Sequence, residues 1–445
     1  MPAYHPDTPE VRQDWAQYYD KVSEADADAG ARLRELEAAG LAEDTIVFYY
    51  ADHGSGMPRS KRWPSDSGLR VPMVVYFPPK WRHLAPKEYA PGGKSDRLVS
   101  FVDLAPTLLS IAGVKPPAHL QGHAFAGKFQ TEPQPFLHGA RGRMDERVDS
   151  VRSVTDGRFV YLRNFHPHVS QGQRVNYQFQ TPTTRVWRAA FDAGKATPAQ
   201  SLFWQVPKAP EELYDLSSDP DEVRNLAGSA EHRATLEKFR SAMRAHAESI
   251  RDVAFLPEGE LHTRAPGVAP YDLARDPAKY PFARIYDTAD LASRLEAAAV
   301  PELRRRTADA DSAVRHWAAL GLLMRGKSGV TAGRAELRTL LNDPSPLVRI
   351  VAAEALTAHG EEADAAPALA VLRELCVPEK NGVFTAMAAL NAIEALGPKA
   401  VSLKPHVAAL NPKGPSPDNR YDSYVPRQIA SISGVRSTPH TVPCG

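Results

Sequence analysis

Residues 8–39 carry apolar side chains at the spacing of one helical face. These positions are Val11, Trp15, Tyr18, Tyr19, Val22, Ala29, Leu33 and Leu36. Gly40 follows directly, and helices commonly end just before a glycine. The pattern predicts one long amphipathic helix whose apolar stripe lies on a sheet.

Two short apolar runs, at residues 45–50 and 71–77, are continuous rather than alternating. Such runs are typical of strands that are covered on both faces in a parallel sheet. A polar loop containing Gly and Pro joins them. Because loops at the carboxyl ends of strands are where open α/β sheets bind ligands, this loop is the first candidate for chemistry.

The pattern changes beyond residue 100. A helix is predicted at 103–112, with Asp103 as its N-cap and Gly113 after its end. Residues 148–154 and 158–165 are rich in strand formers and flank Asp156-Gly157, which is a strong hairpin signal. A short strand at 213–216 and a charged helix ending near residue 250 follow. The sequence therefore predicts a small antiparallel sheet after the first α/β region.

The third region is helical. Three Ala- and Leu-rich segments end at Gly326, Gly360 and Gly397, which are spaced 34 and 37 residues apart. This period resembles that of HEAT repeats, in which each helical unit buries its apolar stripe against its neighbours. Residues 251–290 are predicted to be an irregular connector, and residues 411–445, rich in Pro, Ser, Asn and Gly, a loosely ordered tail.

Composition narrows the class of protein. The chain has 445 residues, of which 43% are hydrophobic, and its 54 basic and 53 acidic residues give a net charge of +1. That balance argues against nucleic acid or an anionic membrane as a partner. No apolar stretch is long enough to span a membrane, and residues 1–15 lack the features of a signal peptide. Cys376 and Cys444 have neither metal-ligand spacing nor the pattern of a disulfide framework.

The loop between the first two strands holds the candidate chemistry. Asp52-His53-Gly54 follows a strand directly, so that a carboxylate and an imidazole are available to a metal ion. Lys61 lies eight residues further on and can return to an anion held by that metal. A metal opposite a cation suits hydrolysis of a sulfate or phosphate ester. The simpler interpretation is that Asp52 caps a turn, His53 lies on the surface, and the basic residues around Lys61 form a solvated loop.

The order of motifs favours the catalytic interpretation. Asp52-His53-Gly54 precedes Pro58-Arg59-x-Lys61-Arg62-Trp63, and both precede Asp66-Ser67-Gly68-x-Arg70-Val71-Pro72. This arrangement resembles the sulfatase family of the alkaline phosphatase superfamily, in its formylglycine-dependent type. Further segments of that pattern are 96–113, Gln121-Gly122, Val151-Arg152, Glu212–Leu216, Asp219-Pro220 and Asn225-Leu226. The resemblance covers about residues 8–250 and corresponds to the carboxyl-terminal part of the family.

The resemblance implies an α/β fold: a partial, doubly wound alkaline-phosphatase-like sheet, a small antiparallel C-terminal sheet and an all-α HEAT-like region. It also implies that a hydrated aldehyde made from Cys or Ser attacks sulfur while a divalent cation, usually Ca²⁺, holds the sulfate. Asp52 and His53 would be metal ligands. Lys61 would be catalytic, binding the sulfate oxygens and favouring departure of the leaving group.

The sequence departs from the family in one respect. The nucleophile motif Cys/Ser-x-Pro/Ala-x-Arg and its neighbouring Asp-Asp pair do not occur in these 445 residues. The histidine that assists proton transfer upstream is also lacking, and the position of His5 does not suit that role. We therefore expect a truncated sulfatase, the back half of the catalytic unit with an incomplete metal site, which is inactive alone.

Three hypotheses follow. The first is a sulfatase-family hydrolase acting on a sulfated carbohydrate or another sulfate ester, whose full-length relatives are periplasmic or exported. The second is a non-catalytic binding protein in which the helical array offers a surface to a protein partner. The third keeps the catalytic arrangement but acts on phosphate esters.

The expected division of the chain has five parts. Residues 1–135 are the end of the sulfatase catalytic domain and residues 136–250 its C-terminal subdomain. Residues 251–295 are the connector, 296–410 the HEAT-like repeats and 411–445 the tail.

Overall fold

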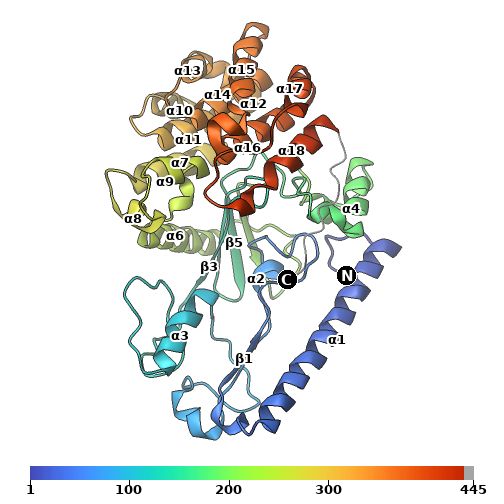
Figure 1. Ribbon diagram of the computed structural model, residues 1–445, viewed down its shortest axis with the longest axis vertical. Coiled ribbons are helices and arrows are strands. Elements are labelled where there is room, and N and C mark those ends of the chain that lie inside the picture. The colour runs from blue at the N-terminus through green and yellow to red at the C-terminus, as the bar shows by residue number, and fades with distance from the viewer. Residues whose placement is uncertain (435–445) are drawn as a thin grey trace.

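The computed structural model describes residues 1–434. Figure 1 shows three regions along its long axis: an array of helices at one end, a four-stranded sheet in the middle, and a long helix beside a two-stranded ribbon at the other end. The antiparallel sheet and the helical repeats expected from the sequence are both present. Within the described residues, no helix combines the length and the apolar character that a membrane span requires.

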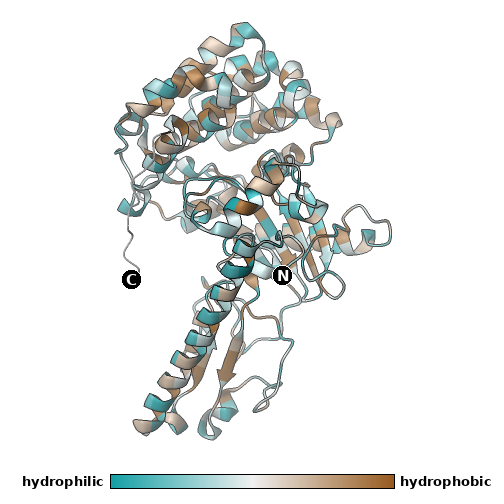
Figure 2. Cartoon of the chain, turned by 90° about the vertical axis from the view of Figure 1, so that its right-hand side faces the viewer, coloured by the Kyte–Doolittle hydropathy of each residue, from teal (hydrophilic) through white to brown (hydrophobic). Residues whose placement is uncertain are grey.

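The predicted first helix is confirmed as α1 (Pro9–Ala38). Thr8 caps it by accepting the Val11 N–H, and Pro9 opens the first turn, where no intrahelical donor is needed. The expectation that its stripe lies on a sheet is wrong, because only Val11 is buried. The helix runs beside the ribbon and touches α4 (Pro182–Asp192) near its start, so most of its apolar face is uncovered in the described structure (Figures 1 and 2).

The two apolar runs form strands β1 (Val47–Tyr50) and β2 (Met73–Tyr76). They pair antiparallel, with Val47 opposite Tyr76 and Tyr50 opposite Met73, so the expected parallel arrangement is wrong for this pair. The chain turns back through one loop and the short helix α2 (Asp66–Leu69) before β2 begins. Burial on both faces is also wrong: Val74 is 58% exposed, since no third strand among the described residues pairs with the ribbon.

Residues 79–131 pack against the ribbon through an apolar cluster around Phe77 and Phe125. The predicted helix at 103–112 is confirmed as α3 (Leu104–Ile111), preceded by the 3₁₀ turns η2 (Pro79–Leu84) and η3 (Phe101–Asp103). Buried Asp103 accepts the N–H groups of Ser100 and His123, at 2.8 and 2.7 Å. The carboxylate thereby fixes both the start of the helix and the segment that returns over it.

The central sheet has the order β3-β4-β5-β6, and every neighbouring pair is antiparallel. Its strands are β3 (Leu137–Arg141), β4 (Val151–Thr155), β5 (Phe159–Asn164) and β6 (Glu211–Asp215). The predicted hairpin is confirmed, with Gly157 at φ 91° in the turn, where a side chain would be strained. The predicted charged helix is α6 (Arg233–Ile250), whose Phe239 packs against β4, β5 and β6.

Between β5 and β6 lie η4 (Gln178–Gln180), α4 and α5 (Pro198–Ser201). They enclose an aromatic cluster that also takes in a residue of the N-terminus and one of the candidate loop. Its buried members are Tyr4, Trp63, Trp187, Phe203 and Trp204. This packing joins three distant stretches of chain on one side of the sheet.

The helical array matches the predicted repeats, since α11 (Ser312–Met324), α14 (Pro346–His359) and α16 (Pro378–Leu396) are its long buried helices. The others are η6 (Ala297–Ala299), α10 (Val300–Arg306), α12 (Gly326–Ala332), α13 (Arg334–Leu340), α15 (Glu362–Leu375), η7 (Gly397–Leu403) and α17 (Lys404–Ala408). One continuous apolar core runs through them.

Two sequence expectations fail next to this array. The segment predicted as an irregular connector contains η5 (Val253–Phe255), α7 (Glu258–Thr263), α8 (Pro270–Arg275) and α9 (Phe282–Ser293). Helix α9 packs on α11 and shares its core. In the predicted tail, η8 (Asn419–Tyr421) and α18 (Tyr424–Ser433) form, and α18 packs on α16 and α17. Both segments fold because the array supplies an apolar surface; residues 435–445 and Cys444 lie outside the described residues.

Arginines of the sheet region hold the array in place. Arg152 on β4 pairs with Asp252 at 2.6 Å, and Arg163 on β5 pairs with Asp290 at 3.1 Å. Both guanidinium groups are almost fully buried. The array is therefore docked on the sheet by specific ion pairs, each of which needs its partner to be stable in so dry a place.

Candidate functional site

The candidate loop leaves β1 at Asp52 and folds into a compact coil before α2. The Gly54 N–H donates to the Gly68 carbonyl at 3.0 Å. A Cβ on Gly54 would overlap the Ser67 carbonyl, and one on Gly68 would overlap the Trp63 carbonyl. The two glycines are thus required by close backbone approach rather than by flexibility.

The same coil brings Lys61 back to the start of the loop. Its backbone N–H donates to the Ser55 carbonyl at 3.1 Å, so Lys61 lies beside the Asp52–Gly54 segment. The Ser60 hydroxyl closes the coil by donating to the Ser67 carbonyl at 2.5 Å. This backbone path keeps Lys61 in the same coil as Asp52 and His53, and the return of its cation to that pair stays a prediction.

Asp52 and His53 place two metal-binding atoms side by side. His53 Nε2 lies 3.5 Å from Asp52 Oδ1, and the Asp52 side chain is 86% exposed. His53 Nδ1 lies 2.6 Å from the Gly54 carbonyl, an acceptor, so that nitrogen carries the proton. The Nε2 lone pair is then free, as in a histidine that binds a metal through one nitrogen and a carbonyl through the other.

These two residues do not complete a metal site. No group of three or more His, Cys, Asp or Glu side chains converges anywhere in residues 1–434. Calcium takes six to eight oxygen ligands, and its affinity follows the number and charge of the ligands. The pair therefore fits two ligands of a divalent cation but not a whole site.

The three basic residues of the loop diverge. Lys61 points to the ring of Tyr177, with Nζ 5.6 Å from the ring centroid, and pairs with no carboxylate in the described part of the chain. Arg62 lies 4.5 Å from the same ring centroid and pairs with Asp145 at 3.0 Å. Arg59 is only 5% exposed. The alternative of a uniformly solvated basic loop is therefore wrong for Arg59 and Arg62.

Arg59 anchors the loop to the turn after β6. It donates to the carbonyls of Asp221 and Glu222, each at 2.7 Å, and its guanidinium lies 4.4 Å from the Tyr4 ring centroid. Glu222 in turn accepts the Asp66 N–H at the start of α2. No local pattern predicts this anchor, because more than 150 residues separate its two halves.

Burial raises the pKa of the Glu222 carboxyl to about 7, although neighbouring Arg59 opposes the shift. An acid in so dry a position is costly to ionise. The loop is thus held in part by a group that changes charge near neutral pH.

Backbone strain concentrates around this loop. Six non-glycine residues have a positive φ in the described chain, and four of them lie here. They are Arg59 at 68°, Arg62 at 81°, Asp145 at 48° and Glu222 at 52°. Each such residue costs on the order of 1–3 kcal/mol and persists only where its surroundings hold it. Strain of this kind is typical of functional sites.

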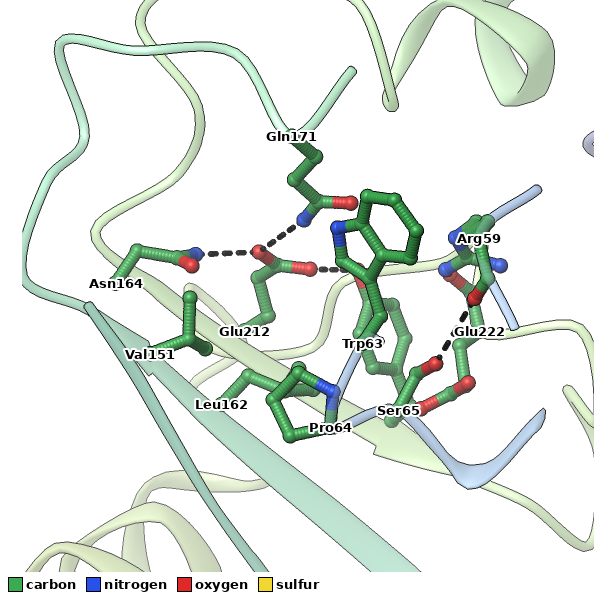
Figure 3. A pocket seen from close by; sticks show the side chains of 11 residues that line it. Arg59, Trp63, Pro64, Ser65, Val151, Leu162, Asn164, Gln171, Glu212 and Glu222 are labelled. Atoms are coloured by element: carbon green, nitrogen blue, oxygen red, sulfur yellow. Dashed lines mark hydrogen bonds between the residues drawn. The ribbon is translucent and has the colours of Figure 1, made fainter. Parts of the chain in front are cut away.

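A small cavity lies beneath the loop (Figure 3). Its wall includes Trp63, Asn164 and Glu212, and Glu212 accepts the Asn164 side-chain amide at 2.6 Å. Trp63 Nε1 and Asn164 Oδ1 are buried and have no hydrogen-bond partner among residues 1–434. The volume is about 10 Å³, close to the space of a single water molecule. The side chains around this cavity pack the loop against the sheet, and the cavity is far too small to hold a sugar.

His5 has a structural place in the described chain. The Trp15 indole donates to His5 Nδ1 at 3.2 Å, so Nε2 carries the proton and donates to the Pro58 carbonyl at 3.2 Å. Burial lowers the pKa of His5 to about 4. The ring is therefore neutral and fastens the N-terminus to the loop.

Cys376 is equally unsuited to catalysis. The thiol is buried at the end of α15, and burial raises its pKa to about 11. A nucleophilic cysteine needs a lowered pKa and access to substrate. Tyr177 and Asp145, which contact the basic loop, were missed by sequence reasoning because no local motif marks them.

Two parts of the chain match known protein families. Residues 1–114 match the sulfatase family model, and residues 300–394 match the model for HEAT repeats. An ulvan-active sulfatase from Formosa agariphila is 39% identical over 261 residues, which is 59% of this chain and 42% of that protein. The human N-sulphoglucosamine sulphohydrolase is 29% identical over 262 residues, covering 55% of this chain and 49% of that protein.

The chain thus spans less than half the length of these curated relatives. A solved structure in complex with D-glucosamine-2-N,6-O-disulfate is 19% identical over 52% of this chain and 40% of that one, with a TM-score of 0.34. A TM-score this low does not by itself establish a shared fold.

Proposed function

We propose that this chain is part of an enzyme that hydrolyses a sulfuric ester. The premise is that residues 1–114 are a sulfatase-family segment and residues 300–394 are HEAT repeats. The substrate is a sulfated carbohydrate or another sulfate ester. The observation that carries the proposal is the compact loop itself: the Lys61 N–H donates to the Ser55 carbonyl, so a lysine without a carboxylate partner in the described chain shares one coil with the adjoining Asp52 and His53 atoms.

Lys61 is assigned to the sulfate. A sulfate ester gathers negative charge on the leaving oxygen as the S–O bond breaks, and a nearby ammonium group stabilises that charge. Because Lys61 pairs with no carboxylate among residues 1–434, it can bind the sulfate oxygens without first breaking an ion pair. Arg59 and Glu222 hold the loop in the shape that this contact needs.

Asp52 and His53 are assigned to a divalent cation, of which Ca²⁺ suits the carboxylate best. Such a cation would polarise the sulfate and position it. The remaining ligands and the nucleophile would come from outside the described residues. For that reason the 445-residue chain on its own is expected to be inactive, and the contributions assigned here are binding and leaving-group stabilisation.

The test starts from the native protein. An antibody raised against the helical array isolates the protein from its source cells, and its intact mass and release of sulfate are measured with aryl sulfate, sulfated oligosaccharide and aryl phosphate. We expect sulfate release that is lost on Asp52→Ala introduced at the chromosomal gene. Release of phosphate in place of sulfate would reassign the substrate, and a native protein of this chain's mass that releases neither anion would make it a non-catalytic binding protein.

A further inference from the structure

Tyr177 presents an open aromatic ring beside the proposed sulfate contact. It is 46% exposed, whereas the aromatic cluster just behind it is buried. Lys61 and Arg62 both lie against this ring, at 5.6 and 4.5 Å from its centroid. An exposed aromatic ring with cations beside it offers an apolar face and positive charge to one ligand.

The backbone on either side of Tyr177 holds the ring in place. Arg147 Nε donates to the Arg174 carbonyl at 2.7 Å, and the Asn176 N–H donates to the Glu146 carboxylate at 2.7 Å. Both contacts come from the turn 144–147, in which Met144 and Arg147 form a bridge. The ring is therefore fixed rather than carried on a free loop.

That turn is in turn held by the helical array. Arg147 pairs with Glu394 on α16 at 2.7 Å. On α18, Arg427 lies 3.4 Å from Glu146 and 4.0 Å from Asp145, the partner of Arg62. Helix α18 thus contacts both carboxylates of the turn: Asp145, which pairs with Arg62 of the loop, and Glu146, which accepts the N–H of Asn176 next to Tyr177.

The charge of this surface is incompletely balanced. Arg62 and Arg427 share the carboxylates of Asp145 and Glu146. Lys61 and the exposed Arg174 have no carboxylate partner in the described structure, and the guanidinium of Arg174 lies over Phe179. Beside Lys61, which is assigned to the sulfate, Arg174 remains for a ligand, three residues before Tyr177 in the chain.

We propose that Tyr177 and Arg174, next to the Lys61 contact with the sulfate, form a subsite for an acidic sugar ring that neighbours the sulfated sugar in a polyanionic saccharide. The C–H face of a sugar ring stacks on an aromatic face, and its carboxylate or sulfate pairs with the Arg174 guanidinium. Helix α18 and the turn 144–147 act as the positioning elements. The assignment of the neighbouring sugar as sulfated rests on the proposed function; the subsite itself rests on the geometry.

The test measures binding rather than turnover. Calorimetric titration of the native protein compares three oligosaccharides of equal length: one carrying sulfate, one carrying uronate and one neutral. We expect the two acidic saccharides to bind and the neutral one to bind at least about tenfold more weakly. Equal affinity for all three saccharides would contradict the proposed subsite. Tighter binding of either acidic saccharide would support it and identify sulfate or carboxylate as the preferred anion.

Three variants localise the effect. Tyr177→Ala and Arg174→Gln are each expected to lower the affinity for the acidic saccharide by about tenfold. Arg427→Gln is expected to weaken it less, and Arg427→Lys to restore it, since the positive charge that holds Glu146 returns. Tyr19→Ala and Arg34→Gln, at exposed positions on α1, are matched controls that leave the affinity unchanged. Unchanged affinity in Tyr177→Ala, with native circular dichroism, contradicts the proposal.

The failure of this inference can be told from the failure of the proposed function. If a saccharide binds in a Tyr177-dependent way while no sulfate is released, the subsite holds and the hydrolase assignment fails. If sulfate is released from an aryl sulfate while Tyr177→Ala leaves the saccharide affinity unchanged, the hydrolase assignment holds and the subsite fails.

Discussion

Glu222 accepts the backbone N–H of Asp66 through both carboxylate oxygens, at 3.1 and 3.2 Å. This contact caps α2 with a carboxyl group from a turn far along the chain, which satisfies a backbone N–H that has no partner within the helix. Arg59 closes the link in the other direction by donating to the Glu222 carbonyl. The loop that holds the candidate site is therefore part of one unit with the turn after β6.

The pH dependence of stability follows from this contact. The pKa of Glu222 is about 7 in the folded chain and near 4.5 when unfolded, so the folded state holds a proton that the unfolded state has released between those values. The free energy of unfolding should therefore fall as pH rises from about 4.5 to 7, by up to about 3 kcal/mol from this group. Glu222→Gln keeps an acceptor for Asp66 but removes this dependence.

Urea denaturation of wild type and Glu222→Gln at pH 5 and pH 8 checks the prediction. Glu354, whose pKa burial also raises to about 7, contributes equally to both proteins and cancels in their difference. A difference between the two proteins that is the same at both pH values would contradict the assignment.

Gly68→Ala should disrupt the candidate loop. The added Cβ meets the carbonyl oxygens of Trp63 and Ser60, which are backbone atoms and cannot turn aside. We expect a loss of at least about 2 kcal/mol in stability and increased proteolysis of the loop. Gly56→Ala in the same loop is the control, because no atom lies within 4 Å of its added Cβ. Equal melting temperatures for the two variants would refute the close approach.

Arg59→Lys should destabilise the chain although the charge is kept. A lysine cannot reproduce two hydrogen bonds to adjacent carbonyls from one planar group, and each such bond to a charged donor is worth about 1.5–3 kcal/mol. Arg70→Lys is the control, since Arg70 forms an exposed ion pair with Asp66 that contributes at most about 1 kcal/mol. Guanidinium unfolding should separate the two variants; similar midpoints would show that Arg59 is no anchor.

Lys61→Ala should lower the turnover of the native protein more than it raises KM. Its charge matters most when the leaving oxygen becomes negative, so we expect a drop of about a hundredfold or more in kcat. Steady-state release of sulfate measures both constants, and Lys80→Ala, which removes an exposed pair with Asp44, is the control. A pure change in KM would limit Lys61 to substrate binding.

The docking of the array on the sheet can be tested at Arg152. Arg152→Ala leaves Asp252 poorly hydrated and unpaired, which should cost about 3–5 kcal/mol. Arg244→Ala breaks a pair with Asp287 that is about half exposed, so its cost should stay below about 1 kcal/mol. A double-mutant cycle with Asp252→Asn should recover part of the loss; additivity of the two substitutions would argue against their coupling.

Local chemistry in the sequence was enough to place most elements. Pro9 and Thr8 mark the start of α1, Asp156-Gly157 marks the hairpin, and the periodic stripes mark the repeat helices. The closing of the loop that carries Lys61 also depends on short spacing, since the Lys61 N–H donates to the carbonyl of Ser55, six residues earlier. In each case the decisive contacts span few residues.

The direction of the β1–β2 pairing was not predictable from the same kind of pattern. A continuous apolar run reports hydrophobicity but carries no information about which strand lies beside it or how it runs. The helices in the presumed connector and tail failed for a related reason: α9 and α18 are stabilised by the surface of the array and not by strong local signals.

The sequence by itself determined the order of the elements, the repeat period and the identity of Asp52, His53 and Lys61 as candidates, since these depend on residue type and short spacing. Only the tertiary structure decided that Arg59 is an anchor, that Glu222 caps α2 and that Tyr177 and α18 border the site. Those contacts join residues more than a hundred positions apart. They depend on how the sheet, the loop and the array pack together, which no local pattern encodes.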